Sequence, residues 1–577
     1  MLGRRKKQVS LFDVGNVWPL ELPEGSFHGQ LAQAAPRLFQ DEAFLAFYSE
    51  RVGRPSVPPS QLALMLLLQQ QAGYSDEEAV ERSGFDLRWA AVLGRLAGAP
   101  LCAKSTLQLF RSHLILHEGV RQLFEGSLQE ARRAGLLKGG KLKVAVDTKP
   151  MLGKGAVEDT YNLWAAGIQQ VARVLAKVSG EKLDVWVARQ GLGRYFGPSL
   201  KGSAELDWSD PQAREAFLTE IVADARRLLH WASFVGEAQR ERVKEACELL
   251  SQLLLQDVEW QEPSEGGPRA QLKQGTAPDR IPSVGDPEQR HGHKSAHKRF
   301  TGHKVAVVVD REGQLILDCA LLPGNAGDAQ GVLEAIERVE ETTGQAVEQV
   351  VGDGAYGSGA TRQAFQEAGR ELVVRAPRSA PPGGRFPKSA FTLNLEEESV
   401  TCPAGQTTRT FTWEGDRGRL YQFGAACTGC PLRNQCTTSA VGRQVRVHPQ
   451  EALLQAARAY QQTPEGQAVL SDRVVVEHGL ARLGALGVGQ ARYRGRTKSL
   501  GQALLAATLA NLRWTWTGWP GRGDRDRPPR TPPPGLRASV GPGHWRCPQH
   551  YSGAAGAAER RAWPPSTLRE GPFLPSL

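Results

Sequence analysis

Three acidic residues stand in settings that could support phosphodiester chemistry. Asp147 ends the apolar run Lys-Val-Ala-Val-Asp, and Asp353 ends a second run, Gln-Val-Val-Gly-Asp. Glu477 follows Arg-Val-Val-Val in a segment with helical spacing. Hard cations such as Mg²⁺ prefer oxygen ligands, and a pair of them can activate an attacking water and stabilise the leaving oxygen of an in-line displacement. These residue types therefore fit a two-metal site that cuts a phosphodiester bond.

The positions of these residues strengthen that interpretation. Both aspartates directly follow apolar runs typical of buried strands, and active sites of α/β folds collect at the carboxyl ends of such strands. Leu470, Arg473 and Glu477 are spaced by three and then four residues, which predicts one face of a helix. The alternative is that all three are surface carboxylates, with Arg473 and Glu477 an ordinary ion pair, because 61 acidic residues allow many accidental triples.

The elements that must position these residues form a mixed α/β core. We assign residues 140–157, 300–375 and 452–515 to this core, with a first strand at about 141–147 and a hairpin beginning near 303. Asp328 is expected to cap the helix that follows the hairpin. The remaining segments are a helical insertion at 158–260, a basic loop at 261–300 and an insertion at 376–451 before the residue Glu477.

Residues 30–135 are expected to be all helical, with short helices and tight glycine turns. The start and stop signals are Ser60, Ser75 with Glu78, Ser105 with Gln108, Gly73, Gly84 and Gly94. This spacing is compatible with a helix-turn-helix-like DNA-binding module. Its candidate phosphate contacts are Arg82, Arg88, Lys104 and Arg111. The alternative is a packing domain with a solvated basic face.

Four of the eight cysteines lie in the insertion at 376–451. Cys427 and Cys430 form a Cys-x₂-Cys pair, the arrangement that presents two thiolates to one tetrahedral Zn²⁺, and Cys402 and Cys436 could complete a structural Cys₄ site. Four free thiols, or a partial site that uses His448, are the alternatives.

Two basic segments are candidates for contact with phosphate. The first spans 290–304 and contributes Lys294, Lys298, Arg299 and Lys304. A solvated loop or a His-rich metal site would also fit it. The second spans 492–498, where Tyr493 could stack on a base. It contributes Arg492, Arg494, Arg496 and Lys498.

Composition agrees with a protein that acts on nucleic acid. The chain has 577 residues, a formal net charge of +10 and a pI near 9.2, which favours polyanionic partners. No apolar run is long enough to predict a membrane span. The N-terminal arm, 1–29, is basic but lacks the apolar segment of a secretory signal, so a cytoplasmic location is expected. Residues 520–577 are rich in Pro, Arg and Gly and are expected to be disordered and dispensable.

The chain resembles DDE transposases of bacterial insertion sequences, within the insertion-sequence-four-like superfamily and its "eleven eighty-two" branch. The matching motifs are Val-Asp-Thr at 146–148, Asp-Thr-Tyr-Asn-Leu at 159–163, Phe-Thr-Gly-His-Lys at 300–304, Gly-Asp-Gly-Ala-Tyr at 352–356, Cys-Pro-Ala-Gly at 402–405, Cys-Thr-Gly-Cys-Pro-Leu-Arg at 427–433, Gln-Thr-Pro-Glu-Gly at 462–466 and Arg-Val-Val-Val-Glu at 473–477. The superfamily pattern Tyr-x-x-Arg-x-x-x-Glu-(x)₆-Lys is matched at Arg473 and Glu477. Leu470 and Gly484 depart from it.

The resemblance implies a ribonuclease H-like core, an N-terminal helical DNA-binding domain and a mostly β insertion before Glu477. It also implies that Asp147, Asp353 and Glu477 bind two Mg²⁺ or Mn²⁺ ions, with Arg473 beside Glu477. The expected activity is cleavage of double-stranded DNA at transposon ends and strand transfer into target DNA, with self-association on the DNA. The alternatives are an inactivated transposase that only binds DNA, and a metal-dependent nuclease without strand transfer.

Overall fold

A computed structural model provides the structure of the chain. It describes residues 1–5, 22–23, 25–49, 51–261, 269–295, 297–377 and 382–517. The expectation of a disordered tail at 520–577, and most of the expectation for the arm at 1–29, lie outside the described residues.

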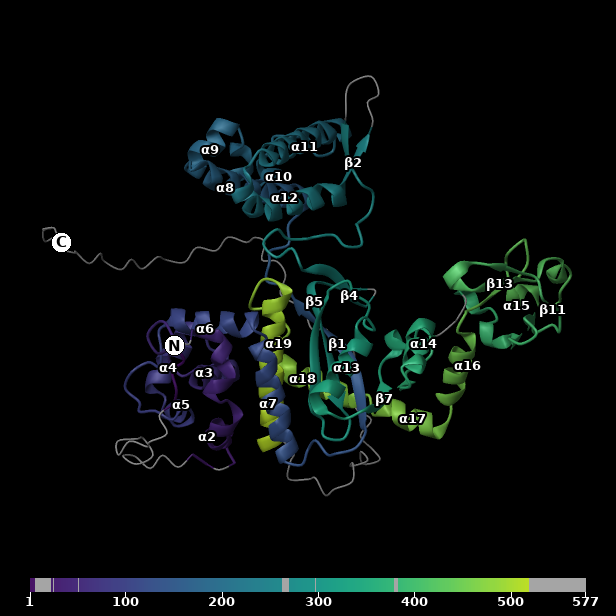
Figure 1. Cartoon of the computed structure of the whole chain (residues 1–577). Helices are drawn as coiled ribbons and strands as arrows, with labels where there is room; N and C mark the ends of the chain where they lie inside the picture. The colour runs from purple at the N-terminus through teal and green to yellow at the C-terminus, as the bar shows by residue number, and fades with distance from the viewer. Residues whose placement is uncertain are drawn as a thin grey trace, which may run out of the picture. The chain divides into compact units, whose positions relative to one another are not determined.

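A mixed sheet carries the two segments that contain Asp147 and Asp353 (Figure 1). Its strands are β1 (Leu142–Leu152), β4 (Arg290–Ser295), β5 (Lys298–Asp310), β6 (Ile316–Pro323), β7 (Val347–Val351) and β8 (Glu371–Val373). The strand β5 lies antiparallel between β1 and β6, while β7 and β8 continue the sheet parallel to β1. The start of β5 also pairs with β4. This arrangement confirms the expected mixed α/β class.

Helices pack on this sheet in the order expected from the sequence. They are α13 (Val332–Thr343), α14 (Gly359–Glu367), α18 (Val474–Ala485) and α19 (Arg496–Thr517). The helix α18 packs on β1 and β5, while α19 packs on β6 and on α7 of the N-terminal region. Apolar strand residues such as Val144 and Val309 are fully buried beneath them. Burial of this apolar surface is the main favourable contribution to the fold.

The helix α19 protects the outer edge of the sheet through one side chain. Asn511 is fully buried; its Oδ1 accepts the Ile316 N–H at 2.9 Å, and its Nδ2 donates to the Ile316 carbonyl at 2.8 Å. Both backbone groups point away from β5, so they would otherwise be unpaired on an edge strand.

The N-terminal region is helical, as expected for 30–135. Its elements are α2 (Phe27–Leu38), η1 (Asp41–Phe47), α3 (Pro59–Ala72), α4 (Asp76–Phe85), α5 (Leu87–Leu93), α6 (Lys104–Leu116) and α7 (Gly119–Arg133). The capping box of Ser75 and Glu78 is confirmed. The capping predictions for Ser60 and Ser105 are wrong, because both residues lie inside their helices. The Ser60 N–H is instead bound by the Asp41 carboxylate at 3.0 Å.

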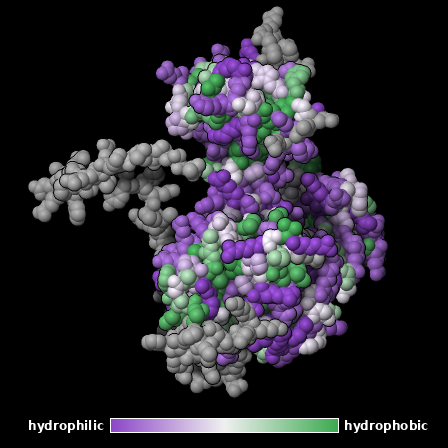
Figure 2. All heavy atoms as spheres, turned by 60° about the vertical axis from the view of Figure 1, so that its left-hand side comes forward, coloured by the Kyte–Doolittle hydropathy of each residue, from purple (hydrophilic) through white to green (hydrophobic). Residues whose placement is uncertain are grey.

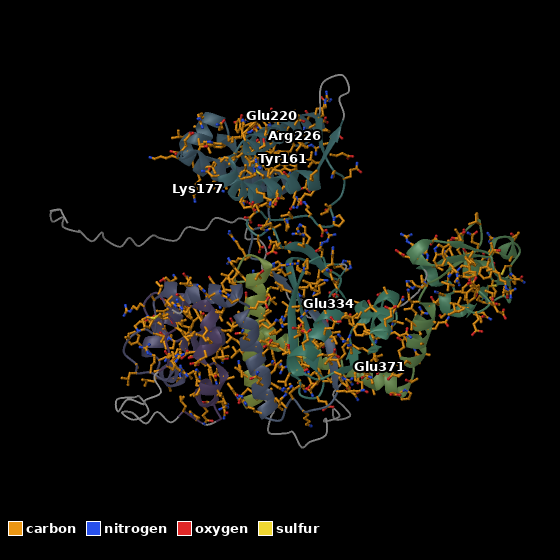
Figure 3. The ribbon with its side chains drawn as sticks, viewed as in Figure 1. Tyr161, Lys177, Glu220, Arg226, Glu334 and Glu371 are labelled. Carbon is orange, nitrogen blue, oxygen red and sulfur yellow. The ribbon has the colours of Figure 1, made fainter. Side chains whose placement is uncertain are left out.

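The insertion at 158–260 is a helical unit with its own apolar core. Its elements are α8 (Thr160–Ser179), α9 (Leu183–Gln190), η2 (Gly193–Phe196), α10 (Leu200–Ser203), α11 (Pro211–Ser233) and α12 (Glu237–Asp257). Tyr161 lies inside this unit against Trp208 and Phe217, with ring centroids 5.0 and 5.9 Å away, whereas Lys177 lies on its outside (Figure 3). The Leu-rich faces of these helices therefore pack internally.

The prediction of a basic loop at 261–300 holds for residues 273–289 but is wrong for the described residues on either side of them. The strands β2 (Val258–Gln261) and β3 (Arg269–Leu272) form a hairpin, and β4 pairs with the start of β5. The strands β2 and β3 alternate apolar and polar residues over only four positions each, which is the shortest run that periodicity can indicate. The strand β4 has no apolar alternation at all. Backbone pairing with a neighbouring strand defines them.

Short strands dominate the segment that precedes Glu477. They are β9 (Thr392–Asn394), β10 (Ser399–Thr401), β11 (Thr407–Thr408), β12 (Phe411–Trp413), β13 (Arg419–Gln422) and β14 (Gln444–Val447). The helices α15 (Arg433–Cys436), α16 (Glu451–Tyr460) and α17 (Pro464–Ser471) belong to the same part of the chain. A small apolar core that includes Phe391, Tyr421 and Val445 supports the strands.

The surface is predominantly hydrophilic on the face shown in Figure 2, with apolar side chains in small groups between the polar ones. Within the described residues, no helix combines the length and apolar character needed to cross a membrane.

Candidate active site

Strand register brings Asp147 and Asp353 together. The neighbouring strands β1 and β7 are parallel, and Ala145 pairs with Val351. Each aspartate lies two residues beyond this pair, Asp147 still within β1 and Asp353 just after β7, and the charge of Asp353 acts on the Asp147 carboxylate. Asp353 follows the end of β7, where its carboxylate accepts the Ala355 N–H at 2.8 Å. The two sequence motifs therefore meet at one edge of the sheet.

Asp147 lies within β1, not at its end. Pairing of Thr148–Leu152 with β5 extends the strand beyond the predicted limit of 147. Burial raises the pKa of Asp147 to about 6. The carboxylates of Asp353 and Asp328 act in the same direction, while the Thr148 N–H and the Arg473 guanidinium oppose them. Asp147 is therefore partly shielded from water and lies close to two other carboxylates, Asp353 and Asp328.

Arg473 links the third carboxylate to the first. Its guanidinium lies 2.6 Å from Glu477 Oε1 and 3.5 Å from Asp147 Oδ2. The prediction of one helix through Leu470, Arg473 and Glu477 is wrong, because α17 ends at Ser471 and α18 begins at Val474. Arg473 is the N-cap residue of α18, and Glu477 lies in its first turn. Arg473 contacts Glu477 four residues ahead on α18 and Asp147 on β1 at the same time.

A fourth carboxylate, Asp328, adjoins this group and was not identified as a site residue from the sequence. It accepts the Thr148 hydroxyl at 2.7 Å and the Lys304 ammonium at 2.8 Å. It does not cap α13, whose N-cap residue is Gly331. Its position after the β6 strand was the available sequence signal. Thr148 and Lys304 therefore fix Asp328 beside Asp147.

Tyr356 is a buried side chain next to the carboxylates of the site. Its ring is buried, and its pKa is raised by burial first and then by the charges of Asp147, Asp328 and Asp353. A Cβ atom at Gly352 would lie 2.9 Å from the Tyr356 ring and 3.1 Å from Val146. The glycine in the Gly-Asp-Gly-Ala-Tyr motif thus makes room for the tyrosine beneath the carboxylates.

The chemistry of the donor set fits a hard cation, because Asp147, Asp353 and Glu477 offer only carboxylate oxygens. Within the described ranges, no group of three or more His, Cys, Asp or Glu side chains has the spacing of a metal site. Asp147 and Asp353 are adjacent, whereas Glu477 is held by Arg473. Arg473 thus links Glu477 to the Asp147 and Asp353 pair, but the three carboxylates are not close enough together to form a complete metal site in the described residues.

The basic residues predicted in the helical domain mostly have acidic or aromatic partners. Arg88 pairs with Asp86 at 2.8 Å, and Lys104 pairs with Glu77 at 2.8 Å. Arg111 is largely buried, pairs with Asp76 at 2.6 Å and lies over the Tyr493 ring. Arg82 lies over the Tyr74 ring. Arg111 and Tyr493 thus have a structural partnership that the sequence did not indicate.

The basic segment at 290–304 divides into two groups. Lys294, Lys298 and Arg299 are exposed on β4 and the start of β5. Lys304 is buried against Asp328 and the Ala326 carbonyl. His303 is fully buried and His291 binds Thr301. The exposed residues remain available to a polyanion.

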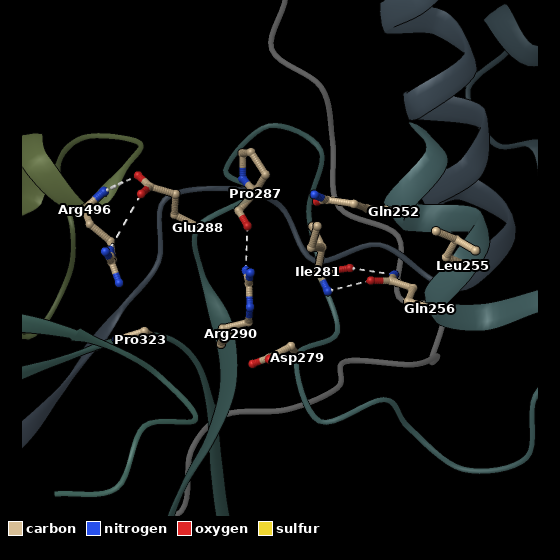
Figure 4. Close-up of a pocket in the computed structure, with 10 residues that line it drawn as sticks. All are labelled: Gln252, Leu255, Gln256, Asp279, Ile281, Pro287, Glu288, Arg290, Pro323 and Arg496. Carbon is tan, nitrogen blue, oxygen red and sulfur yellow. Dashed lines mark hydrogen bonds and ion pairs between the residues drawn. The ribbon is translucent and has the colours of Figure 1, made fainter. Parts of the chain in front are cut away.

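The second basic segment adjoins a cavity of about 640 Å³ (Figure 4). The cavity is lined by Gln252, Leu255, Gln256, Asp279, Ile281, Pro287, Glu288, Arg290, Pro323 and Arg496. Glu288 accepts the Arg496 N–H at 2.7 Å at the start of α19. Arg492 donates to the Tyr74 carbonyl, while Arg494 and Lys498 are exposed. None of the three site carboxylates lines this cavity.

Lys149 is a cation of the site that the sequence did not identify. Its Nζ donates to the Leu480 carbonyl of α18 at 3.3 Å, and it lies next to Gly484. Burial lowers the pKa of Lys149, and the charge of Lys294 adds to this effect. Lys149 therefore fills the space left by the missing side chain at 484.

Four cysteines of the insertion gather at one small pocket. Cys402, Cys427, Cys430 and Cys436 line it together. Burial raises the pKa of Cys436, and the neighbouring thiols act in the same direction. Their spacing does not form a metal cluster in the part of the chain that the structure describes. His448 is not part of this pocket and accepts the Gln450 N–H at 3.2 Å.

Comparisons with known proteins indicate the class of protein. The family described as Transposase DDE domain matches residues 401–516, which include Glu477. The family described as Transposase domain (DUF772) matches residues 20–113 in the helical region. Neither a curated protein nor a solved structure matches the chain. The two family matches support a DDE transposase, and the DDE domain implies a ribonuclease H-like core.

Proposed function

We propose that the chain is a DNA transposase of the insertion-sequence-four-like superfamily, in its "eleven eighty-two" branch, that cuts the ends of its element and joins them to target DNA. The observation that carries the proposal is the convergence of Asp147 on β1, Asp353 just after the adjacent parallel strand β7, and Glu477 on α18. The two transposase-domain matches support the same class of activity.

The reaction consists of two displacements at phosphorus. A water oxygen attacks the phosphorus at the element end, the P–O3′ bond breaks, and a 3′-hydroxyl is released. That 3′-hydroxyl then attacks a phosphodiester of target DNA, forming a new P–O3′ bond and displacing the target's own 3′-oxygen. Two bound Mg²⁺ or Mn²⁺ ions would supply activation of the attacking oxygen and stabilisation of the leaving one.

The residues of the chain have separate contributions to this reaction. Asp147, Asp353 and Glu477 would hold the ions through carboxylate oxygens. Arg473 keeps Glu477 directed toward Asp147, at 2.6 and 3.5 Å. Thr148 and Lys304 fix Asp328 alongside. Self-association of two chains on paired DNA ends belongs to the proposal and follows the resemblance.

Cleavage and strand transfer can be tested together. Purified protein is mixed with Mg²⁺, a labelled duplex carrying an inverted repeat from beside the coding sequence, and a supercoiled target plasmid. Nicking at the repeat and joining of label to the plasmid support the proposal. Nicking without joining would indicate a plain nuclease, and binding without nicking would indicate an inactive DNA-binding protein.

We also propose a structural zinc ion for the cysteine pocket. The four thiols lie around one pocket, and Cys427 and Cys430 have the spacing that suits tetrahedral zinc. Such a site would hold the short strands β9 to β14 together, because their apolar core is small.

The zinc proposal predicts about one Zn²⁺ per chain in freshly purified protein, the stoichiometry of a single tetrahedral site. A Cys427→Ser/Cys430→Ser variant should lose the metal and increase proteolysis within 386–447. A Cys247→Ser variant, which changes a cysteine of the helical insertion, serves as the control and should retain zinc. Metal analysis that finds no zinc in the unmodified protein would refute the site.

A further inference from the structure

We infer that Lys149 binds a backbone phosphate of the DNA strand held at the three carboxylates, next to the phosphate that reacts. The inference rests on the proposed function and assigns a DNA contact to a residue of β1. It depends on the placement of Lys149 relative to Asp147 and α18.

The strand β1 presents Asp147 and Lys149 on the same face. Side chains alternate along a strand, so residues two apart share a face and are separated by about 7 Å. Asp147 lies within 3.5 Å of Arg473, the N-cap residue of α18. Lys149 donates to Leu480, further along the same helix. One strand face therefore presents a carboxylate at one position and a cation at the next.

The helix α18 also has a carboxylate, Glu477, near its start and a contact with Lys149 further along. Glu477, Leu480 and Gly484 are spaced by three and four residues, which places them on one face of the helix. Glu477 meets Arg473 at one end of this face, and Leu480 and Gly484 meet Lys149 at the other. The strand and the helix thus line a track that runs from the carboxylates to Lys149.

The absence of a side chain at 484 gives Lys149 its position. A Cβ atom there would collide with the Lys149 Nζ. The ammonium consequently lies near the carboxyl-terminal end of α18, where the helix dipole favours a cation.

Lys149 has no acidic partner among the described residues. Its Nζ donates to the neutral Leu480 carbonyl, whereas Lys304 and Arg473 form ion pairs with carboxylates of the site. Lys149 is partly buried, whereas Lys294 on β4 is an exposed cation whose charge acts on Lys149 and which also has no ion pair in the described ranges. Two adjacent cations without a carboxylate between them fit a polyanion, and the track places its phosphates beside the reacting one.

The salt dependence of DNA binding tests this contact. Affinity is measured without metal, on the same labelled duplex used for cleavage, over a range of salt concentrations. The slope of log K against log [salt] is negative, and loss of one phosphate contact reduces its magnitude by about 0.9. We expect this decrease for Lys149→Gln. Lys143→Gln removes the same charge from an exposed position on β1 and should leave the slope unchanged.

Relocating the cation separates a phosphate contact from a structural role. In a Lys149→Ala/Gly484→Lys variant, the ammonium enters the same space from the helix. We expect the magnitude of the salt slope in this double variant to return toward that of the unmodified protein. In Lys149→Ala alone, the magnitude of the slope should stay reduced. Melting temperatures of all variants are measured to confirm that each one is folded.

The outcomes distinguish this inference from the proposed function. Equal slopes for Lys149→Gln and Lys143→Gln, or a folded double variant that stays at the Lys149→Ala value, would overturn the inference even if cleavage is normal. A reduced slope for Lys149→Gln, in a protein that never cleaves the duplex with Mg²⁺, would support the phosphate contact and overturn the proposed chemistry.

Discussion

Replacing any one of the three carboxylates by its amide is expected to reduce metal-dependent DNA nicking by about a thousandfold or more. Asp147→Asn, Asp353→Asn and Glu477→Gln preserve side-chain size but remove an anionic oxygen donor. A divalent ion contributes several kcal/mol of charge stabilisation, and about 4 kcal/mol corresponds to a thousandfold change in rate. The measurement is the single-turnover nicking rate with Mg²⁺ on an inverted-repeat duplex.

Matched substitutions at exposed acidic residues control for the loss of charge. Asp184→Asn on α9 and Glu334→Gln on α13 each remove one surface carboxylate and should nick DNA at the normal rate. All three site variants should still bind DNA, because the bound phosphates are contacted by basic residues. A site variant that nicks at nearly the normal rate would exclude that residue from the catalytic set.

The sequence predicted the central arrangement because its signals are local. Two apolar runs, each followed by an aspartate, predicted strands, and parallel pairing of β1 with β7 then brings Asp147 and Asp353 together. The capping box of Ser75 and Glu78 was also correctly predicted from residues three apart. Patterns of this kind need no information about distant parts of the chain.

Features that depend on long-range contacts could not be predicted in the same way. The partnerships of Lys304 with Asp328 and of Lys149 with α18 join residues far apart in sequence. Lys304 looked like a surface cation within a basic run, and only the fold shows that it is buried. The break between α17 and α18 likewise has no glycine or proline signal at Asp472 and Arg473.

The side chain of Asn511 shows how such a long-range contact affects stability. Replacing Asn511 by Ala would leave the Ile316 N–H and carbonyl unpaired in a buried setting. Each unpaired buried group costs about 1–3 kcal/mol, so for two groups we expect a loss of about 2–6 kcal/mol in the free energy of unfolding of this region. A lower melting temperature and faster amide hydrogen exchange across residues 316–323 are the measurements.

Asn511→Leu separates the lost hydrogen bonds from the cavity that alanine leaves. Leucine fills a similar volume but cannot pair with the backbone, so it should be nearly as destabilising as alanine if the two hydrogen bonds are the cause. A leucine variant as stable as the unmodified protein would show that packing of α19 protects the β6 edge without Asn511. Because α19 also packs on α7, loss of this contact should loosen the attachment of the helical N-terminal region to the sheet. Faster exchange in α7 of the alanine variant would confirm that link, and unchanged exchange there would limit the effect of Asn511 to the edge of β6.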